Sequence, residues 1–424
     1  MKNIINNFFN KINKNKYSNK NFKNLLCNQN INKIFSAFSN YKNYSEIRFV
    51  GGCIRKFLNK EEIDDIDLAT NVDPSETKKI LENYNIKYFE PGISHGTVIA
   101  VLDKINYEIT SLRKDISTDG RRAEVKFTNS WIDDASRRDF TINSIYSDID
   151  GNLFDPFNGK SDLQNGILNF IGDPDIRIKE DYLRILRYIR FFLNYSTKPH
   201  KEKIKKTLKQ NISGIKTLSK ERLLDELKKI YLSKKFLNLM EDEFLLELIN
   251  LIFPELKNIN LFKNLNYFAI ENFHKKDFIF FISLAILDNT DNTEYFLFKY
   301  NISNEDKKRI KFLKEMNNKI SDKNFFTEKN INKIYYLTNI SYVLDLFDLK
   351  IFQSKTVDKN LINLKSLFVN KPKPVFPVKA NYLINSFNLK EGKTLGEKLK
   401  KLENFWIDNN FKISKKDIIK VVNN

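Results

Sequence analysis

Two aspartates separated by one residue, Asp65 and Asp67, are the first side chains in the sequence whose type and spacing suggest chemistry. If this segment is a strand, residues i and i+2 share a face, so the two carboxylates lie side by side. Neighbouring carboxylates repel unless a cation separates them, and Mg²⁺ prefers oxygen ligands that it shares with substrate phosphates. A lone D-x-D is more typical of a solvated turn, but its position about a dozen residues after Gly51 and Gly52 favours a Mg²⁺ site.

Such a site predicts phosphoryl or nucleotidyl transfer. Two metal ions held by Asp65 and Asp67 would activate a hydroxyl and stabilise a leaving pyrophosphate. The glycine pair, at a turn from strand to helix, would offer backbone N–H groups to a triphosphate. Glu108, on a predicted strand over 107–110, is our candidate for a third catalytic carboxylate, and Glu124 is its rival.

Residues 137–144 (RRDFTINS) form a second polar constellation. Paired arginines suit a triphosphate, which makes Arg138 a nucleotide-binding candidate. Asp139 can accept hydrogen bonds from ribose hydroxyls, which would favour ribonucleotides. Asn143, one turn further on, shares its face and can bind either group. The alternative is a surface ion-pair cluster at the start of a helix.

Residues 180–184 (EDYLR) form the third, and predict recognition of a base. On a helix, Asp181 and Arg184 are neighbours that accept and donate hydrogen bonds, respectively. Cytosine and adenine each present an amino donor beside a ring-nitrogen acceptor, whereas uracil and guanine place a carbonyl there. The pair would therefore select C and A and replace a nucleic-acid template. The alternative is an intrahelical salt bridge. Arg187 joins the nucleotide-binding candidates.

The composition is consistent with a polyanionic partner such as nucleic acid. The chain has 424 residues and a net charge of +19, although its abundance of Lys, Asn, Ile and Phe resembles compositional drift, which alone would add Lys. Arginine is more informative, because 12 of the 13 arginines lie between Arg48 and Arg222. A planar guanidinium cannot be replaced by lysine at a bidentate site, so this region is expected to hold the functional sites.

The small numbers of cysteine and histidine, and the absence of long apolar runs, argue against several other kinds of site. The two cysteines, Cys27 and Cys53, cannot build a disulfide framework, and with the three histidines they give no zinc-ligand spacing. No apolar run is long enough for a membrane span, and no signal peptide is evident. We therefore expect a cytoplasmic protein without a membrane partner. The sequence leaves its oligomeric state open.

The elements that must position these residues read as an α+β protein, with a small mixed head and a long helical remainder. Residues 113–122 are polar and are expected to form a mobile loop, and prolines mark a linker within 369–379. Strands are expected at 47–50, 65–69, 97–102 and 105–110, with helices at 22–41, 54–58, 74–84 and almost throughout beyond 178. We predict an N-terminal segment over 1–45, a catalytic head over 46–160, a neck over 161–235 and a body and tail over 236–424.

Taken together, these segments resemble the class II CCA-adding enzymes, the tRNA nucleotidyltransferases of the poly(A) polymerase family. In chain order, five family motifs are similar to residues 51–70, 137–144, segments within 155–174, residues 180–184 and residues 219–226. The third and fifth are expected to be structural. One position departs from the pattern, since Lys56 stands where the family usually has Asp after the motif arginine, Arg55. Asp64 is a possible substitute for that Asp.

The resemblance implies a polymerase-β-like sheet in the head, with Gly51, Gly52 and Arg55 binding the nucleotide beside Mg²⁺. It implies that CMP and AMP from CTP and ATP are added to the 3′ end of tRNA, with Asp181 and Arg184 reading the base. The helical half would hold the acceptor stem and T arm through phosphate contacts. The counterpart of residues 113–122 helps to switch specificity from C to A.

Four other functions share some of these features. A poly(A) polymerase acting on general RNA has every motif, and differs in not accepting C. An enzyme that adds only A after a partner has added CC is a second. A catalytically silent RNA-binding relative is suggested only by Lys56. A toxin-type or antibiotic-modifying nucleotidyltransferase does not explain the long basic helical half or the base-reading pair.

Overall fold

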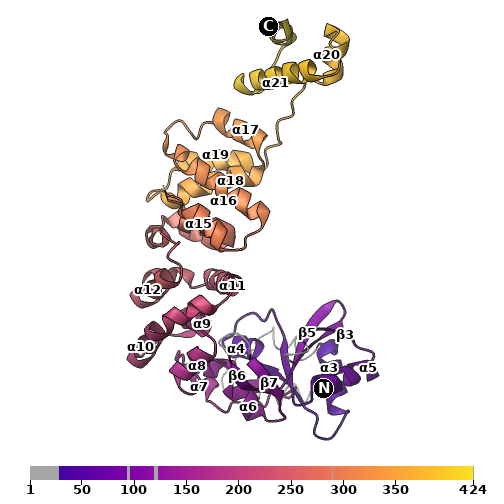
Figure 1. Cartoon of the computed structure of the whole chain (residues 1–424), viewed down its shortest axis with the longest axis vertical. Coiled ribbons are helices and arrows are strands. Elements are labelled where there is room, and N and C mark those ends of the chain that lie inside the picture. The colour runs from indigo at the N-terminus through magenta and orange to yellow at the C-terminus, as the bar shows by residue number, and fades with distance from the viewer. Residues whose placement is uncertain (1–27, 93–95, 119–122, 289, 424) are drawn as a thin grey trace. The chain divides into compact units, whose positions relative to one another are not determined.

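The computed structural model describes residues 28–92, 96–118, 123–288 and 290–423. The described chain forms two compact units, one ending at Ile252 and the other beginning at Phe253. The first unit contains both sheets, and the second is helical (Figure 1). The predicted α+β architecture is confirmed. The first six residues of the helix expected over 22–41 lie outside the described residues, and the rest of it is α3 (Gln29–Ser39).

A seven-stranded mixed sheet forms the head, in the order β3-β4-β5-β2-β1-β8-β9. β2 and β5 are parallel, and the other neighbours are antiparallel. The strands are β1 (Ile47–Val50), β2 (Asp67–Thr70), β3 (Lys87–Gly92), β4 (Thr97–Leu102), β5 (Ile105–Ser111), β8 (Tyr146–Ser147) and β9 (Leu153–Phe154).

The strand expected over 65–69 begins two residues later than predicted. β1 and β2 pair from Ile47↔Thr70 to Phe49↔Leu68, and the chain leaves β1 after Val50. β1 therefore offers no partner for Asp65, which precedes β2 as an irregular residue. The alternation that was expected to align the two aspartates does not apply to it.

Helices cover both faces of this sheet. One face carries Ile47 and Phe49 of β1 and packs on α3 and on helices α4 (Gly52–Leu58) and α5 (Pro74–Asn83). The other face carries Val50 and packs beside α6 (Trp131–Ser136). This alternation along β1 is the period of two expected of a strand, and it directs the end of β1 into the turn that begins α4.

The loop predicted over 113–122 is wrong for its described part, which is a strand. β6 (Arg113–Thr118) pairs with β7 (Ala123–Phe127) in a separate two-stranded sheet, with a register shift between Asp115 and Ser117. Residues 119–122 lie outside the described residues. The segment alternates little between apolar and polar residues, so it lacks the pattern by which a half-buried strand is recognised.

Six further helices complete the described part of the first unit. They are α7 (Gly159–Gln164), α8 (Pro174–Glu180), α9 (Arg184–Tyr195), α10 (Glu202–Asn211), α11 (Lys220–Tyr231) and α12 (Glu243–Ile252), with 3₁₀ turns η2 (Thr141–Asn143), η3 (Ile212–Thr217) and η4 (Phe236–Met240). Helix α9 matters most for the site. Arg184, Arg187 and Arg190 recur every three residues along it, so they lie along one side of the helix.

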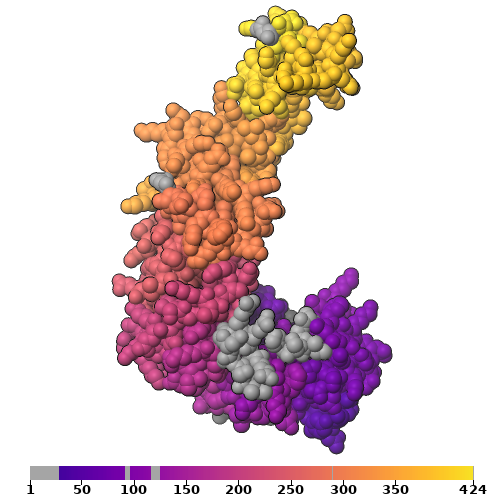
Figure 2. Space-filling view, in the orientation of Figure 1, coloured from indigo at the N-terminus to yellow at the C-terminus, as the bar shows by residue number. Residues whose placement is uncertain are grey.

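The second unit is built from ten helices and three 3₁₀ turns among its described residues. They are α13 (Tyr267–Asn272), α14 (Phe278–Ile286), α15 (Asn292–Lys299), α16 (Asn304–Asn317), α17 (Glu328–Leu337), α18 (Ile340–Gln353), α19 (Lys359–Val369), α20 (Ala380–Phe387), α21 (Lys393–Asp408) and α22 (Lys415–Asn423), with η5 (Ile259–Asn264), η6 (Phe273–Lys275) and η7 (Lys319–Ser321). Helices α20 to α22, yellow in Figure 2, pack around a core of their own that includes Leu383 and Leu402.

The proline-marked linker is confirmed, because α19 ends at Val369 and α20 begins at Ala380. Among the helices that the structure describes, none is long and apolar enough to cross a membrane.

Candidate active site

A cavity of about 610 Å³ in the first unit brings the predicted site residues together. It lies where the β1–α4 turn, the start of β2, the segment after α6 and the helices α9 and α11 meet. Of the predicted site residues, only Glu108 does not line it. The lining residues are Gly51, Gly52, Arg55, Lys56, Asp64, Asp65, Asp67, Arg137, Arg138, Asp139, Asn143, Asp181, Leu183, Arg184, Arg187, Arg190, Phe191, Arg222 and Lys229.

The Gly51–Gly52 turn is built as the sequence predicts. Gly51 precedes α4 with φ of +66°, a conformation that side chains disfavour. A Cβ on Gly52 would lie 3.7 Å from Asp67 Oδ2, so the backbone passes close to this carboxylate. Arg55 donates from Nη1 to Asn143 Oδ1, and its guanidinium lies 4.7 Å from the centre of the Phe191 ring. The turn therefore places a backbone edge and an arginine beside the aspartates.

The three predicted carboxylates interact with one another. Glu108 pairs with Asp67 in the β2–β5 register, although it does not reach the cavity lining. Burial raises the pKa of Asp67, opposed by the charge of Arg138 and reinforced by that of Asp65. Burial also raises the pKa of Glu108, and repulsion from Asp67 and Asp65 raises it further. The side chain of the rival, Glu124, lies outside the described side chains.

A divalent cation fits these residues. Among the residues that the structure describes, no three His, Cys, Asp or Glu side chains converge as a metal cage. Mg²⁺ rarely uses such a cage, since it usually takes one or two carboxylates and completes its shell with water and substrate phosphates. Asp65 and Asp67 supply two carboxylates on one cavity wall. Burial and repulsion from Asp65 raise the pKa of Asp67, and a cation would relieve both effects.

Lys56, the departure from the family pattern, pairs with Asp64. Its Nζ contacts Asp64 Oδ1, and the same oxygen accepts the backbone N–H of Asp65 at 3.0 Å. Partial burial opposes ionisation of Asp64, but the hydrogen bond and charge of Lys56 hold its pKa below the usual value. Asp64 is therefore engaged by Lys56 at the cavity wall, and the pair holds the peptide that leads into Asp65.

We expect activity to survive when the charges of Lys56 and Asp64 are exchanged together. Reversing the charge of Lys56 alone should lower activity. Exposed ion pairs contribute up to about 1 kcal/mol, so Lys56→Glu should lower kcat/KM for the nucleotide about fivefold. The double variant Lys56→Glu/Asp64→Lys should recover most of the loss. Steady-state kinetics across a Mg²⁺ titration measures both.

Lys79→Glu is the matched control, because it makes the same charge change on the exposed side of α5. Equal activities for Lys56→Glu and the wild-type protein would show that the pair has no role. A double variant no better than the single one would contradict the pairing.

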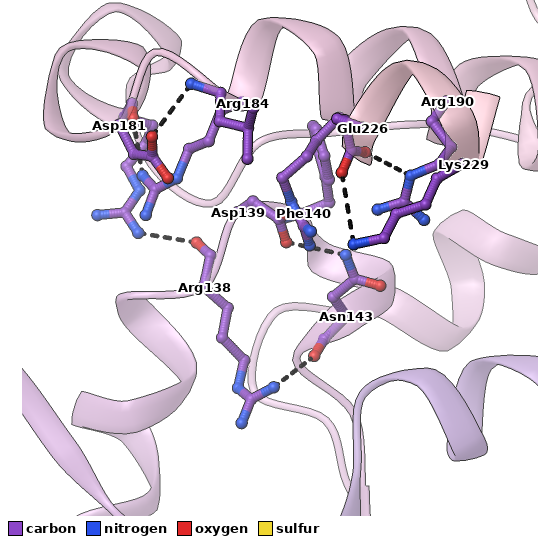
Figure 3. A network of polar contacts seen from close by, with 12 residues as sticks. Arg138, Asp139, Phe140, Asn143, Asp181, Arg184, Arg190, Glu226 and Lys229 are labelled. Atoms are coloured by element: carbon purple, nitrogen blue, oxygen red, sulfur yellow. Dashed lines mark hydrogen bonds and ion pairs between the residues drawn. The ribbon is translucent and has the colours of Figure 1, made fainter. Parts of the chain in front are cut away.

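Asp139 lies deep in the wall, 7% exposed, and both of its oxygens have partners. Oδ1 accepts from the backbone N–H of Phe140 at 2.9 Å and from Asn143 Nδ2 at 2.8 Å. Oδ2 accepts from Arg187 Nε at 2.6 Å. Burial would raise the pKa of Asp139, but Arg187 and these hydrogen bonds hold it well below its usual range. Asn143, which contacts Asp139 in Figure 3, also links this carboxylate to Arg55.

The arginine pair of residues 137–144 is anchored by a carboxylate that sequence reasoning missed. Asp134, on α6, contacts the guanidinium groups of both Arg137 and Arg138. An acid three and four residues ahead of two arginines is the signal that could have found it. The predicted alternative, an ion-pair cluster at a helix start, is wrong in one respect, because these arginines follow the end of α6.

Asp181 and Arg184 both line the cavity, but they are not neighbours on one helix. Asp181 is extended (φ −154°, ψ 105°) after α8, and Arg184 is the first residue of α9. The Asp181 side chain causes this break, since its Oδ1 accepts the backbone N–H of Leu183 at 3.1 Å. Such local bonds compete with helix formation. The alternative interpretation, an intrahelical salt bridge, is wrong, because the described contacts of this pair include no such bridge.

Each of the two has another charged partner. Asp181 Oδ2 accepts from Arg222 Nη2 at 2.8 Å. Arg184 is 9% exposed and donates to Glu180 Oε2 at 2.7 Å and to the carbonyl of Arg137 at 3.0 Å. Arg222, on α11, was predicted only as part of a structural motif, and it lies 41 residues from Asp181 in sequence.

Helices α9 and α11 are joined through Glu226, 1% exposed. Its carboxylate binds Arg190 and pairs with Lys229 (Figure 3). The Glu226–Lys229 pair measures 3.9 Å. Arg190 and Lys229 were not predicted site residues, although the spacing of Arg184 and Arg187 could have pointed to Arg190. This contact between two helices is consistent with the structural role expected of residues 219–226.

The cavity carries nine basic and five acidic side chains, so its net charge is positive. The acids that face the β1–α4 turn suit cations, and the basic groups of α9, α11 and residues 137–138 suit a polyphosphate. The arrangement can hold a nucleoside triphosphate with its metal.

Comparison with known proteins agrees with this chemistry. Residues 47–169 match the family model of the poly A polymerase head domain, and residues 201–260 match the probable RNA and SrmB-binding site of polymerase A. Fold and site thus place residues 47–169 in the class of poly A polymerase head domains. The CCA-adding enzyme of Streptococcus gordonii is 30% identical over 86% of this chain and 89% of its own length. The chain belongs to the family of CCA-adding enzymes.

Other relatives match in part. The mitochondrial CCA tRNA nucleotidyltransferase 1 of Homo sapiens is 45% identical over 45% of this chain and 44% of its own length, and that of Danio rerio is 41% identical over 47% of each. The chain thus spans about half the length of these relatives. The crystal structure of the Bacillus stearothermophilus CCA-adding enzyme with CTP aligns with a TM-score of 0.73, at 20% identity, over 95% of this chain and 97% of that one. At this identity the likeness concerns the fold.

Proposed function

We propose that the protein adds CMP and AMP from CTP and ATP to the 3′ end of tRNA, building or repairing the CCA terminus without a nucleic-acid template. The single observation that carries this proposal is the cavity, whose wall combines Asp65 and Asp67 with Asp181 and Arg184. A catalytic carboxylate pair and a donor–acceptor pair for a base are thereby placed around one space. Relatives named as CCA-adding enzymes support the same activity.

Each side chain has a distinct role in this proposal. Asp65 and Asp67 hold Mg²⁺, which when bound activates the 3′-hydroxyl and stabilises the leaving pyrophosphate. Glu108, on the neighbouring strand, is the third catalytic carboxylate and adds its negative charge beside Asp67. Gly51, Gly52, Arg55, Arg138 and Arg187 bind the triphosphate, and Asp139 and Asn143 position the ribose.

Base selection depends on hydrogen-bonding capacity that Asp181 and Arg184 do not use within the protein. A carboxylate oxygen has two lone pairs, so each oxygen of Asp181 can accept a further bond beside Leu183 N–H or Arg222. Arg184 Nε donates to no partner among the described residues, whereas its two Nη atoms do. The pair can thus meet the amino donor and ring acceptor of C or A.

We assign nucleotidyl transfer to residues 46–160, base selection to 161–235 and tRNA binding to 236–424. Residues that line the cavity fall in the first two ranges. The net charge of +19 supports contacts with tRNA phosphates. We also propose a reducing, cytoplasmic compartment, supported by the buried free thiol of Cys53.

A poly(A) polymerase acting on general RNA is the second candidate, favoured by the match to the poly A polymerase head domain. The two functions differ in whether C is accepted and whether tRNA is required. An enzyme that adds only A would fail with CTP alone.

We expect purified protein with Mg²⁺ to add two C residues and then one A to a tRNA transcript that lacks CCA. CTP, ATP or both are supplied, an unrelated RNA is the control, and products are resolved at single-nucleotide resolution. Addition to tRNA only establishes CCA addition. A lengthening A tail on either RNA would instead identify a poly(A) polymerase, and no incorporation by folded protein would contradict both functions.

A further inference from the structure

Asp134 is the most heavily bonded carboxylate beside the cavity, and it has no role in the mechanism given above. It lies in α6 and is 1% exposed. Its Oδ1 accepts from Arg137 Nε at 2.9 Å and Nη2 at 2.7 Å. Its Oδ2 accepts from Arg138 Nε at 3.3 Å and Nη2 at 3.1 Å, and from Tyr146 OH at 2.6 Å. Oδ1 also accepts from the backbone N–H of Arg113 at 3.4 Å, so six hydrogen bonds converge on one buried carboxylate.

The charge of Asp134 makes this arrangement possible. Burial would raise its pKa, but the charges of Arg138 and Arg137 and the Tyr146 hydrogen bond hold it far below the usual range. Burial likewise opposes the charge of Arg138, and Tyr146 and Asp134 raise its pKa. Asp134 is ionised, and it offsets the repulsion between two arginines on consecutive positions.

Asp134 also fixes the direction of both arginines. Arg137 donates to Asp134 from Nε and Nη2, which leaves Nη1 without a described partner. Arg138 is gripped through Nε and Nη2, while its Nη1 reaches the carbonyl of Asn143 at 3.4 Å. Both arginines line the cavity, whereas Asp134 does not. The carboxylate is behind the wall and the guanidinium groups are in it.

The backbone of Arg137 and Arg138 contacts two further arginines, one of which, Arg184, belongs to the proposed base-reading pair. The carbonyl of Arg137 accepts from Arg184 Nη2 at 3.0 Å, and that of Arg138 accepts from Arg177 Nη2 at 2.8 Å. A shift of Arg137 would therefore move a hydrogen-bond acceptor of Arg184. The Asp134 carboxylate therefore contacts the side chains of Arg137 and Arg138, and the backbone of Arg137 connects it to Arg184.

We propose that Asp134 is a positioning residue that holds Arg137 and Arg138 in the geometry required by the triphosphate of the incoming nucleotide. This inference rests on the proposed function, in which Arg138 binds that triphosphate, and it extends the same role to Arg137, which lines the same cavity. Asp134 does not touch the substrate, and acts only through the two guanidinium groups. A purely structural anchor between α6 and Tyr146 of β8 is the alternative, and it would change stability without changing nucleotide affinity.

The test replaces Asp134 with Asn, which keeps the shape and removes the charge. Loss of charge-assisted bonds on two arginines should raise KM for CTP and ATP about tenfold or more. KM for tRNA should stay near the wild-type value, and the inhibition constant of pyrophosphate should rise in parallel with KM for the nucleotides. Asp133→Asn, on the same helix and in contact with neither arginine, is the matched control.

Asp134→Glu keeps the charge but moves it by one methylene, so it remains informative if the Asn variant fails to fold. We expect it to raise KM for the nucleotides with a near-normal melting temperature. Unchanged KM and unchanged pyrophosphate inhibition in a folded variant would overturn the inference.

Calorimetric titration with CTP and Mg²⁺ separates this inference from the proposed function. If the wild-type protein binds CTP but does not extend tRNA, the proposed function fails, and weaker CTP binding by Asp134→Asn still supports the positioning role. If the wild-type protein extends tRNA and Asp134→Asn binds CTP equally well, only the positioning role fails.

Discussion

Replacing Asp65 or Asp67 with alanine should abolish nucleotide incorporation while tRNA affinity is kept. A metal-bound carboxylate contributes several kcal/mol to transition-state stabilisation, so we expect kcat to fall about a thousandfold or more. The fold should survive. Burial raises the pKa of Asp67, so its charged form opposes folding and its removal does not lower the melting temperature. Single-turnover incorporation, tRNA binding and thermal unfolding measure the three quantities.

Asp150→Ala removes an exposed carboxylate from the turn before β9 and is the matched control. Near-normal activity of either Asp65→Ala or Asp67→Ala would remove that residue from the metal site. The same assay decides the third carboxylate. Glu108→Gln should lower activity, because Glu108 pairs with Asp67 in register, and a larger loss in Glu124→Gln would transfer the role to Glu124.

The double variant Asp181→Ala/Arg184→Ala should lose discrimination among the four nucleotides. A hydrogen bond to a charged group contributes about 1.5–3 kcal/mol, so two such bonds support selectivity of about a hundredfold or more. We expect CTP, ATP, UTP and GTP to be incorporated at rates within about tenfold of one another. Single-nucleotide competition on tRNA ending in C or CC measures this.

Asp175→Ala/Lys179→Ala is the matched control, since it removes an acid–base pair of 2.6 Å from the exposed side of α8. This control should retain wild-type selectivity. Unchanged selectivity in Asp181→Ala/Arg184→Ala would contradict the protein-template mechanism and would direct attention to other lining residues.

Sequence patterns were sufficient where one short segment determines its own structure. The strand over 47–50 and the hairpin of β4 and β5 carry the apolar runs or the alternation typical of strands, and the turn of the hairpin uses Asp103 and Lys104 at positive φ. β6 was missed because its residues are mostly polar, and the helix over 180–184 was wrong because Asp181 bonds to Leu183 N–H instead.

The sequence predicted which residues form the candidate site, but not which side chains they bind. All predicted residues except Glu108 line one cavity. The residues that orient them lie far away in sequence, such as Arg187, 48 residues from Asp139, and Arg222, 41 residues from Asp181. No spacing rule of a helix or strand relates residues so distant. Asp134 was close enough to be found, and it was missed because an acid near two arginines is common on surfaces.

The wall of the cavity is drawn from residues 51–229, and no described residue of the second unit lines it. Of the 13 arginines only Arg309 lies beyond Arg222, and it is paired with Asp345 and Asp277 inside the second unit. We therefore expect substitutions in the second unit to leave the choice of nucleotide unchanged, because the described residues that line the cavity all belong to the first unit.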